Sequence, residues 1–411
     1  MSVVNPALFH TGLINQDRRV VDMAPSIMFL APRFAQILLF AAKPSAAPYG
    51  SAHGLSEPGA KSIQLGVRTV TNFEYKWLED QLKSTVTAIN NASGYTTTDT
   101  SFVVDDASIF AINDLVQNVR TGEVYAVTAV NTGTNVITAL RSWGAIAAAA
   151  INDNDSLMII GNSFSENSVY VLQPQRIDET KYNYIQDTRH AFGGTFVLQH
   201  SELYGGDQKG HMRSKFLAVH QQYIEASLIW GQRNAGSGTD GSPKKTTGGL
   251  LEGITTNVKA ITGALTKSTW HRFLRDIFTY GSAEKVIFGS PAVMEQISNF
   301  AADSSAAPAS QIWLAQNARS FGLNIMTYMT KFGTVHLVMH GMFTGDTYGG
   351  YAIAIDPGNI QLCRVRGGFF MNLREDIVRD GAHHWIDEYA TYFGLALGLE
   401  KSHGVLTGVA A

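Results

Sequence analysis

The sequence predicts an α+β protein with one long helix, many short strands and a small all-β insertion. Helical spacing of apolar residues runs through 207–233, closely spaced strand and turn signals fill 96–161, and strands alternate with two shorter helices beyond residue 250. Charged residues make up 16% of the 411 residues, well below the usual quarter. This composition indicates that the protein removes part of its surface from water by self-association.

The helix predicted over 207–233 has apolar residues on two faces. At about 1.5 Å of rise per residue it is roughly 40 Å long, so we refer to it as the spine helix. A helix of this kind commonly lies between layers or subunits, although an ordinary buried helix of a large domain is the alternative. One stripe contains Met212, Phe216, Val219, Tyr223, Ala226 and Trp230, and the other contains Leu217, Ile224 and Leu228.

The segments before the spine helix differ in character. Residues 1–61 are rich in proline and small residues and predict an extended arm with one short helix at 27–40. Strand-like alternation begins near residue 62 and continues to 95. After the insertion, 162–200 returns to extended character, and a two-stranded projection would suit this segment.

The stretch 96–161 is rich in Val, Thr, Ile, Asn and Asp, with turn signals spaced for short strands. The clearest local prediction is a hairpin in which VYAVTAV and VITALRSW flank the turn NTGTN. We therefore expect a small all-β domain inserted into the main chain.

The C-terminal half predicts a second α+β domain over 250–366 and a return to the first sheet over 367–411. The preceding segment, 234–249, is flexible by composition. Ser268 is expected to cap a helix that ends at Gly281, and Pro291 is expected to open the next helix.

Charge and cysteine content exclude several classes of protein. The net charge of -3 gives no strong basic field for tight nucleic-acid binding. The single cysteine, Cys363, rules out an internal disulfide framework and a cysteine-rich metal site. The N-terminus lacks a signal-peptide pattern, and the most apolar stretch, 27–42, is too short and too interrupted to cross a membrane.

No motif for catalysis, a cofactor or a metal rises above background. The loop GSGTDGSPKK lacks the ending of a phosphate-binding loop. His336 and His340 lie on a strand-like run, where they are too far apart for one ion, and the adjacent His383 and His384 point to opposite faces. Aspartate pairs at 105–106 and 153–155 are best explained as turn residues, and a catalytic carboxylate pair stays open.

Several stretches together resemble the major capsid proteins of tailed double-stranded DNA phages, which share the Hong Kong 97-type fold. The resemblance is closest to the branch in which the spine helix leads through Thr-Thr-Gly-Gly-Leu-Leu, here 246–251, into the next domain. The stretches FEYKWLEDQL, KYNYIQDTRHAFGGT, EKVIFGSPAVMEQISNF, FGTVHLVMHGMF and AIDPGNIQL follow in the same order. Their order covers most of the chain beyond residue 60.

The resemblance implies a division of the chain into capsid domains. It implies an N-terminal arm at 1–61, a peripheral domain at 62–95 and 162–249 with the spine helix and an extended loop around 169–195, and an inserted β domain at 96–161. It further implies an axial domain at 250–366, with 367–411 returning to the peripheral sheet.

It also implies a shell subunit that is not an enzyme, assembled in the host bacterial cytoplasm into hexamers and pentamers of a virion. Double-stranded DNA would be confined without sequence readout, and there is room for a decoration protein, a portal and a separate scaffold as partners. No cofactor, metal or membrane is implied. The candidates for contact with neighbouring subunits are Lys181, Tyr182, Tyr184, Met212, Phe216, Tyr223, Trp230, Lys244, Lys245, Thr246, Thr247, Gly248 and Gly249.

Three alternatives stay open at this point. An encapsulin-like compartment would use the same fold to hold an enzyme cargo, and nucleic acid in purified particles would separate it from a virion shell. An α+β hydrolase with a β accessory domain would form only a small oligomer. A tail tube or decoration protein is disfavoured by the long spine helix.

Overall fold

The computed structural model describes Ile37 and residues 66–201, 207–302, 314–320, 323–377 and 383–410. The predicted arm at 1–61, apart from Ile37, lies outside the described residues. The chain divides into two units, an insert comprising Trp77–Lys181 and a body comprising the remainder. Strands β2 (Glu74–Glu79) and β9 (Glu179–Tyr184), which pair in a two-stranded sheet, both cross this boundary.

The insert is a six-stranded sheet with the order β3-β8-β5-β6-β7-β4. Its hairpin β6–β7 follows the predicted turn, and the four side chains Phe102, Tyr125, Ile137 and Leu157 are fully buried in one apolar core. The strands are β3 (Val86–Ala88), β4 (Ser101–Val103), β5 (Asp114–Asn118), β6 (Val124–Asn131), β7 (Val136–Leu140) and β8 (Ser156–Asn162).

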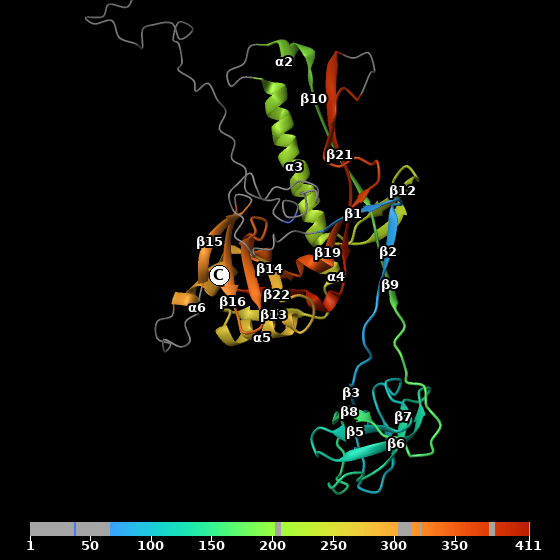
Figure 1. Ribbon diagram of the computed structural model, residues 1–411. Coiled ribbons are helices and arrows are strands. Elements are labelled where there is room, and N and C mark those ends of the chain that lie inside the picture. The colour runs from blue at the N-terminus through green and yellow to red at the C-terminus, as the bar shows by residue number, and fades with distance from the viewer. Residues whose placement is uncertain are drawn as a thin grey trace, which may run out of the picture. The chain divides into compact units, whose positions relative to one another are not determined.

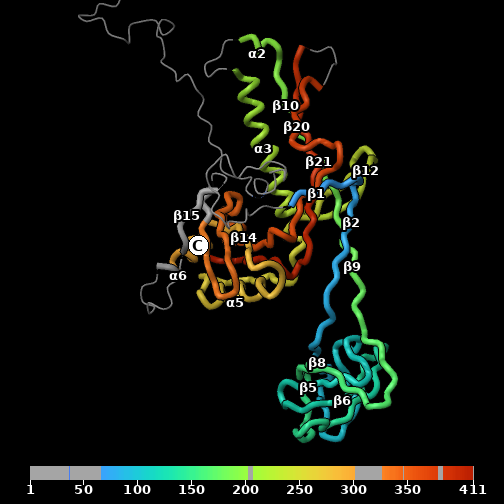
Figure 2. Tube along the Cα trace, in the orientation of Figure 1, coloured from blue at the N-terminus to red at the C-terminus, as the bar shows by residue number. Residues whose placement is uncertain are grey.

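The first sheet of the body has five strands. Its central strand β21 pairs antiparallel with β10 over ten residues, and Figure 2 follows these two strands together with β20 beside the spine helix. Parallel pairing of β1 with β19 completes the sheet. The strands are β1 (Gly66–Val70), β10 (Gln186–Thr195), β19 (Ile360–Val365), β20 (Asn372–Arg374) and β21 (His384–Leu397).

The second sheet of the body has seven strands in the order β13-β22-β18-β14-β17-β16-β15. Figure 1 labels β13, β14, β15, β16 and β22 of this sheet. Strand β14 is central and pairs parallel with β17 and antiparallel with β18. The strands are β13 (Val258–Gly263), β14 (Glu284–Gly289), β15 (Leu314–Ser320), β16 (Leu323–Met329), β17 (Thr334–Met339), β18 (Ala352–Ile355) and β22 (Gly404–Val409).

The spine helix is α3 (Gln208–Trp230), and Asp207 caps it by accepting hydrogen bonds from the backbone N–H groups of Lys209 and Gly210. The body also contains shorter helical elements and one hairpin. They are α2 (Phe196–His200), β11 (Asn234–Ser237), β12 (Pro243–Thr246), α4 (Leu250–Gly253), α5 (Lys267–Phe278), α6 (Pro291–Ala302), α7 (Gly345–Tyr348), η4 (Pro357–Asn359) and η5 (Glu400–Ser402).

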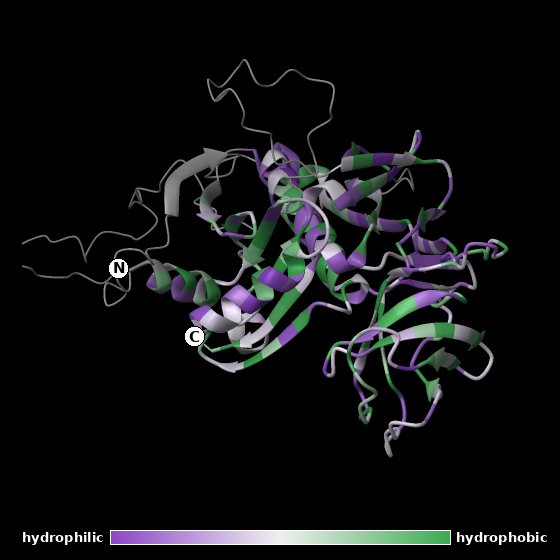
Figure 3. Cartoon of the chain, turned by 60° about the horizontal axis from the view of Figure 1, so that its bottom comes forward, coloured by the Kyte–Doolittle hydropathy of each residue, from purple (hydrophilic) through white to green (hydrophobic). Residues whose placement is uncertain are grey.

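Two apolar cores share the strands of the seven-stranded sheet because alternate residues of each strand face opposite sides. Val286 and Phe288 of β14 pack with Ile224 and Leu228 of the spine helix, whereas Ile287 packs with the α5 and α6 side chains. In Figure 3 helices alternate between hydrophilic and hydrophobic positions, while several strands carry long hydrophobic stretches. The spine helix is therefore one side of the larger core.

Several local predictions need correction. Thr266, and not Ser268, caps α5, because its hydroxyl accepts from the N–H of Thr269 and the helix begins at Lys267. The segment predicted to be flexible, 234–249, contains the antiparallel hairpin β11–β12. Glycine and serine composition does not preclude a hairpin when tight turns need those residues.

The strands also cross the predicted domain boundaries. Strand β3 begins ten residues before the predicted start of the insertion at 96 and pairs with β8. Strand β19, which lies inside the predicted axial domain, pairs with β1 and β21 of the five-stranded sheet, and β22 from the C-terminus pairs within the seven-stranded sheet. Periodicity identifies strands but does not specify their partners, so sequence order alone misassigned them.

Candidate subunit interface

The spine helix was predicted to offer Met212, Phe216, Tyr223 and Trp230 to neighbouring subunits. Met212 and Phe216 are partly buried and pack against β10 and β21 within the chain, where the ring of Phe216 stacks on Phe192 with centroids 4.7 Å apart. Trp230 packs against Tyr348, with ring centroids 4.9 Å apart. Only Tyr223 of the four is more than half exposed, at 53%.

The segment Thr246–Gly249 forms a junction inside the body. Asn183 is buried and joins three segments, since its side-chain amide donates to the carbonyls of Gly248 and Leu395 and its oxygen accepts from the N–H of Gly248 at 2.8 Å. Thr247 is fully buried, and its hydroxyl accepts from the N–H of Leu395. Thr246 lies beside the junction, where its hydroxyl donates to the carbonyl of Gln232.

The glycines of this junction permit close backbone approach. A Cβ on Gly249 would lie 2.8 Å from the nitrogen of Gly231 and 2.9 Å from the carbonyl oxygen of Ile229, so any side chain would displace the end of the spine helix. Thr247, Gly248 and Gly249 are buried within one chain, so they stabilise the fold of this segment.

Two cations lie over aromatic rings beside the junction. The Arg233 guanidinium lies 4.1 Å from the ring centroid of Tyr182 and donates to its carbonyl at 2.7 Å. The Lys245 ammonium lies 5.0 Å from the centroid of Tyr184, whose ring meets Tyr182 edge to face. Such contacts orient both tyrosines while leaving Tyr182 38% exposed.

The two remaining candidates are lysines with different surroundings. Lys181 forms an ion pair with Glu179 at 2.7 Å, which holds two exposed charges in one place. Lys244 is exposed on β12 of the hairpin.

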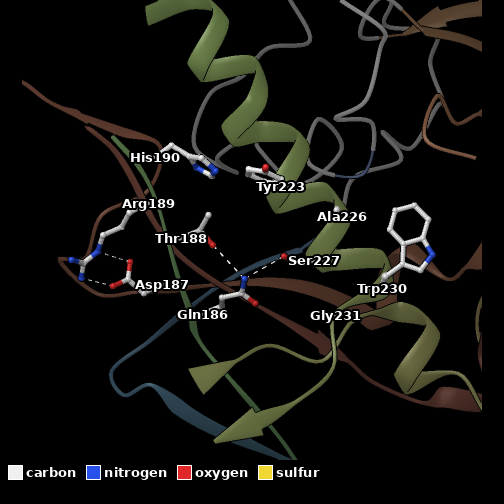
Figure 4. A pocket seen from close by; sticks show the side chains of 10 residues that line it. All are labelled: Gln186, Asp187, Thr188, Arg189, His190, Tyr223, Ala226, Ser227, Trp230 and Gly231. Atoms are coloured by element: carbon white, nitrogen blue, oxygen red, sulfur yellow. Dashed lines mark hydrogen bonds and ion pairs between the residues drawn. The ribbon is translucent and has the colours of Figure 1, made fainter. Parts of the chain in front are cut away.

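A hollow of about 500 Å³ lies between β10 and the spine helix (Figure 4). The Gln186 amide donates to Thr188 and to Ser227, and Asp187 pairs with Arg189. Its other lining residues are His190, Tyr223, Ala226, Trp230 and Gly231.

The insert carries the most exposed apolar side chains of the described residues. Four of them lie close together in the irregular segment that follows β8, and another precedes β3. A single isolated chain exposes this apolar area to water, which favours its burial by another molecule. The five exposed apolar side chains are Val169 at 78%, Tyr170 at 85%, Leu172 at 87%, Ile177 at 85% and Leu82 at 97% exposure.

The histidines discussed as metal candidates have structural surroundings. His340 is buried and bonds through Nε2 to Glu225 at 2.9 Å, while Glu225 also accepts from the N–H of Ile37 at 2.6 Å. His336 lies on β17, and burial lowers its pKa. No group of three or more potential metal ligands occurs among the described residues, and no helix in that part of the chain is long and apolar enough to span a membrane.

Comparisons with solved structures place this architecture among phage-type capsids. The structure of a native GTA particle capsid covers 98% of this chain and all of that chain at 9% identity, with a TM-score of 0.50. A capsid structure of Mycobacterium phage Bobi covers 96% and 97% at 7% identity and a TM-score of 0.47, and the SrpI encapsulin of Synechococcus elongatus covers 57% and 77% at 12% and 0.41. No curated protein matches the sequence.

The spine helix, the two mixed sheets and the insertion are those of a Hong Kong 97-type shell subunit. The family model of the SU10 major capsid protein matches residues 48–410, so the chain belongs to that family. It is therefore a structural protein of a virion capsid, and its copies assemble into a shell.

Sequence reasoning missed several residues that shape this region. Asn183, Arg233 and Glu252 carry no motif, yet Glu252 accepts from the N–H of Arg233 at 2.6 Å. The exposed apolar row from Val169 to Ile177 was predicted as part of an extended projection, but not as the most exposed apolar segment. The available signal was that the apolar residues of this segment neither alternate regularly with polar residues nor stand between turn residues.

Proposed function

We propose that the chain forms hexamers and pentamers of an icosahedral shell that confines double-stranded DNA, and that it catalyses no reaction. The observation that carries this proposal is the family match over residues 48–410. A net charge of -3 agrees with confinement by a closed wall, which needs no sequence-reading residues.

The proposed subunit contacts are the exposed members of the predicted set together with the apolar row of the insert. Tyr223, Tyr182, Lys181 and Lys244 are available at the surface, whereas Thr247, Gly248 and Gly249 support the fold behind them. The apolar row lies in the insert, whereas Tyr223, Tyr182 and Lys244 lie in the body, so we propose separate contacts for the two units. The predicted division into arm, peripheral, inserted and axial domains remains part of the proposal, with β3 added to the insert, β19 to the peripheral sheet and β22 to the axial sheet.

The partners and the place of assembly follow the same reasoning. Assembly in the bacterial cytoplasm agrees with the single buried thiol, Cys363, since a reducing compartment favours chains without disulfides. A decoration protein, a portal and a separate scaffold are proposed as further partners of the shell.

The test is expression of the full chain, followed by sedimentation and electron microscopy of the product. We expect closed shells or capsomers from the wild type. Tyr170→Asp with Leu172→Asp is expected to give a folded chain, judged by circular dichroism, that sediments more slowly. Asp178→Asn, an exposed change near that segment, is the matched control.

A wild type that stays a monomer under every ionic condition would contradict the proposal. Extraction of particles from infected or lysogenic cells addresses the cargo, because double-stranded DNA inside them supports a virion and a packaged enzyme supports an encapsulin-like compartment.

A further inference from the structure

Two histidines connect the spine helix to β10. Their Nδ1 atoms lie 2.8 Å apart, His220 from the helix being fully buried and His190 from the strand half-buried at the edge of the hollow. The ring of His190 stacks on Tyr223 at a centroid distance of 4.6 Å, and Figure 4 shows the two rings facing each other. The proposed shell function does not use this pair.

The hydrogen bonds around the pair define where its protons lie. The Thr391 hydroxyl accepts from the N–H of Met371 at 2.9 Å and lies 2.7 Å from Nε2 of His220. A hydroxyl has one proton and two acceptor lone pairs, so Thr391 can donate to that nitrogen or accept from it, and with Thr391 as the donor the protons are placed as follows. His220 then carries its proton on Nδ1 and donates it to Nδ1 of His190, which keeps its proton on Nε2.

Added protons change this chain in two steps. The first proton makes His190 a cation that donates to His220, and the proton of His220 moves to Nε2, where it competes with the Thr391 hydroxyl proton. A second proton places hydrogen on both Nδ1 atoms, which face each other at 2.8 Å. Two donors cannot hydrogen-bond to each other, so the doubly protonated pair must separate.

No carboxylate is free to compensate this charge among the described elements that pack around the pair. On β10, Asp187 is paired with Arg189. On β21, Asp387 is paired with Arg213 of the spine helix and Glu388 with Arg374 of β20. Lys209 of the helix also approaches Asp387, and the other neighbours are the phenol rings of Tyr223 and Tyr389, which supply no carboxylate.

We propose that the His190–His220 pair is an acid-sensitive contact, which holds the spine helix against β10 at neutral pH and releases it on acidification. Burial lowers the pKa of His190, and burial together with the neighbouring His190 lowers the pKa of His220 to about 4. Histidines with a lowered folded-state pKa stabilise the contact fully above about pH 6.5, and this stability is lost as the pH falls toward 4.

Hydrogen–deuterium exchange of the full chain tests the proposal, with rates corrected for the intrinsic effect of pH. Between pH 7.5 and pH 4.5, peptides from 186–195 and 213–224 are expected to lose protection at least tenfold more than peptides of the insert. His190→Gln removes one titrating ring while its amide oxygen still accepts from His220. In this variant the acid-induced loss of protection is expected to fall several-fold.

His200→Gln is the matched control, because His200 is exposed, and its exchange profile should follow the wild type. His190→Phe, which keeps the ring stack on Tyr223, is a second non-titrating variant in case the first does not fold. If the wild-type peptides 186–195 and 213–224 were as well protected at pH 4.5 as at pH 7.5, the proposal would be overturned. An unchanged acid response in the folded His190 variants would overturn it as well.

Discussion

The insert and the body differ in charge and in the distance between the residues that stabilise them. Residues 77–181 contain 12 acidic and 5 basic residues, a net charge of -7, and no histidine. The body contains the other 22 acidic and 26 basic residues, a net charge of +4, together with all 12 histidines. The two units should therefore respond differently to acid and to mutation.

Their buried hydrogen-bonded side-chain pairs show the same contrast. In the insert, Arg141 and Glu123 are only 18 residues apart and bond at 2.8 Å. In the body, Lys285 and Asp356 are 71 residues apart, and Glu225 and His340 are 115 apart. The insert can complete its core from one continuous segment, whereas the body needs distant parts of the chain at once.

The largest predicted effect is the loss of a buried ion pair in the body. Lys285→Met leaves the Asp356 carboxylate buried without its cation, 2.8 Å away in the wild type, and is expected to cost about 3–5 kcal/mol of unfolding free energy. Chemical denaturation monitored by exchange would show the loss in the body and not in the insert.

Lys331→Met is the control for this change, because Lys331 is an exposed residue of the same sheet's β16–β17 turn. It is expected to alter the unfolding free energy by no more than about 0.5 kcal/mol. If the insert loses protection together with the body in Lys285→Met, the two units unfold as one and the comparison fails.

In the unmodified chain, acid is predicted to lower the stability of the body before that of the insert. Burial lowers the pKa values of both His220 and His403 to about 4. Between pH 6.5 and 4 the unfolded body binds protons that the folded body does not, so its stability decreases, by about 3 kcal/mol for each histidine as an upper figure.

The stability of the insert should not change between about pH 6.5 and about pH 4.5. The hydrogen bonds from Arg120 lower the pKa of Asp155, and those from Arg141 lower the pKa of Glu123 against the opposing effect of burial. A carboxyl with a lowered pKa contributes stability above about pH 4.5, which is lost only in more acidic solution. Exchange measured against pH in one sample compares the two units directly, and parallel loss of protection above pH 5 would contradict this prediction.

The sequence predicts elements with local signals correctly, and it does not predict which distant strands pair. The hairpin β6–β7, the spine helix and the opening of α6 at Pro291 were predicted correctly, because their signals lie within a few residues of one another. The partners of β19 and β22 were not, since no local pattern specifies which distant strand completes a sheet. The burial of the interface candidates was not predictable for a related reason, as buried Thr247 and exposed Lys244 lie on one short segment and differ in their tertiary contacts.

A smaller predicted effect concerns the buried guanidinium of Arg141 inside the insert. Glu123→Gln keeps the shape of the side chain but removes the charge that accepts from Arg141, and is expected to cost about 1.5–3 kcal/mol. The loss should appear in exchange of β6 and β7. Glu166→Gln, at an exposed position of the insert, is the control. If Glu123→Gln lowered protection only in the body, the pair would not stabilise the insert as predicted.

The smallest predicted effects concern exposed aromatic residues, one in each unit. Tyr182→Ser removes the ring beneath Arg233 and should cost about 0.5–1 kcal/mol, because cation–π contacts at exposed sites are worth that much. Trp143→Ser removes a ring that is 55% exposed in the insert and should change the unfolding free energy by no more than about 0.5 kcal/mol. Denaturation of the dissociated subunit measures both. A larger loss for Trp143 than for Tyr182 would mean that the insert depends on its surface more than its buried core suggests.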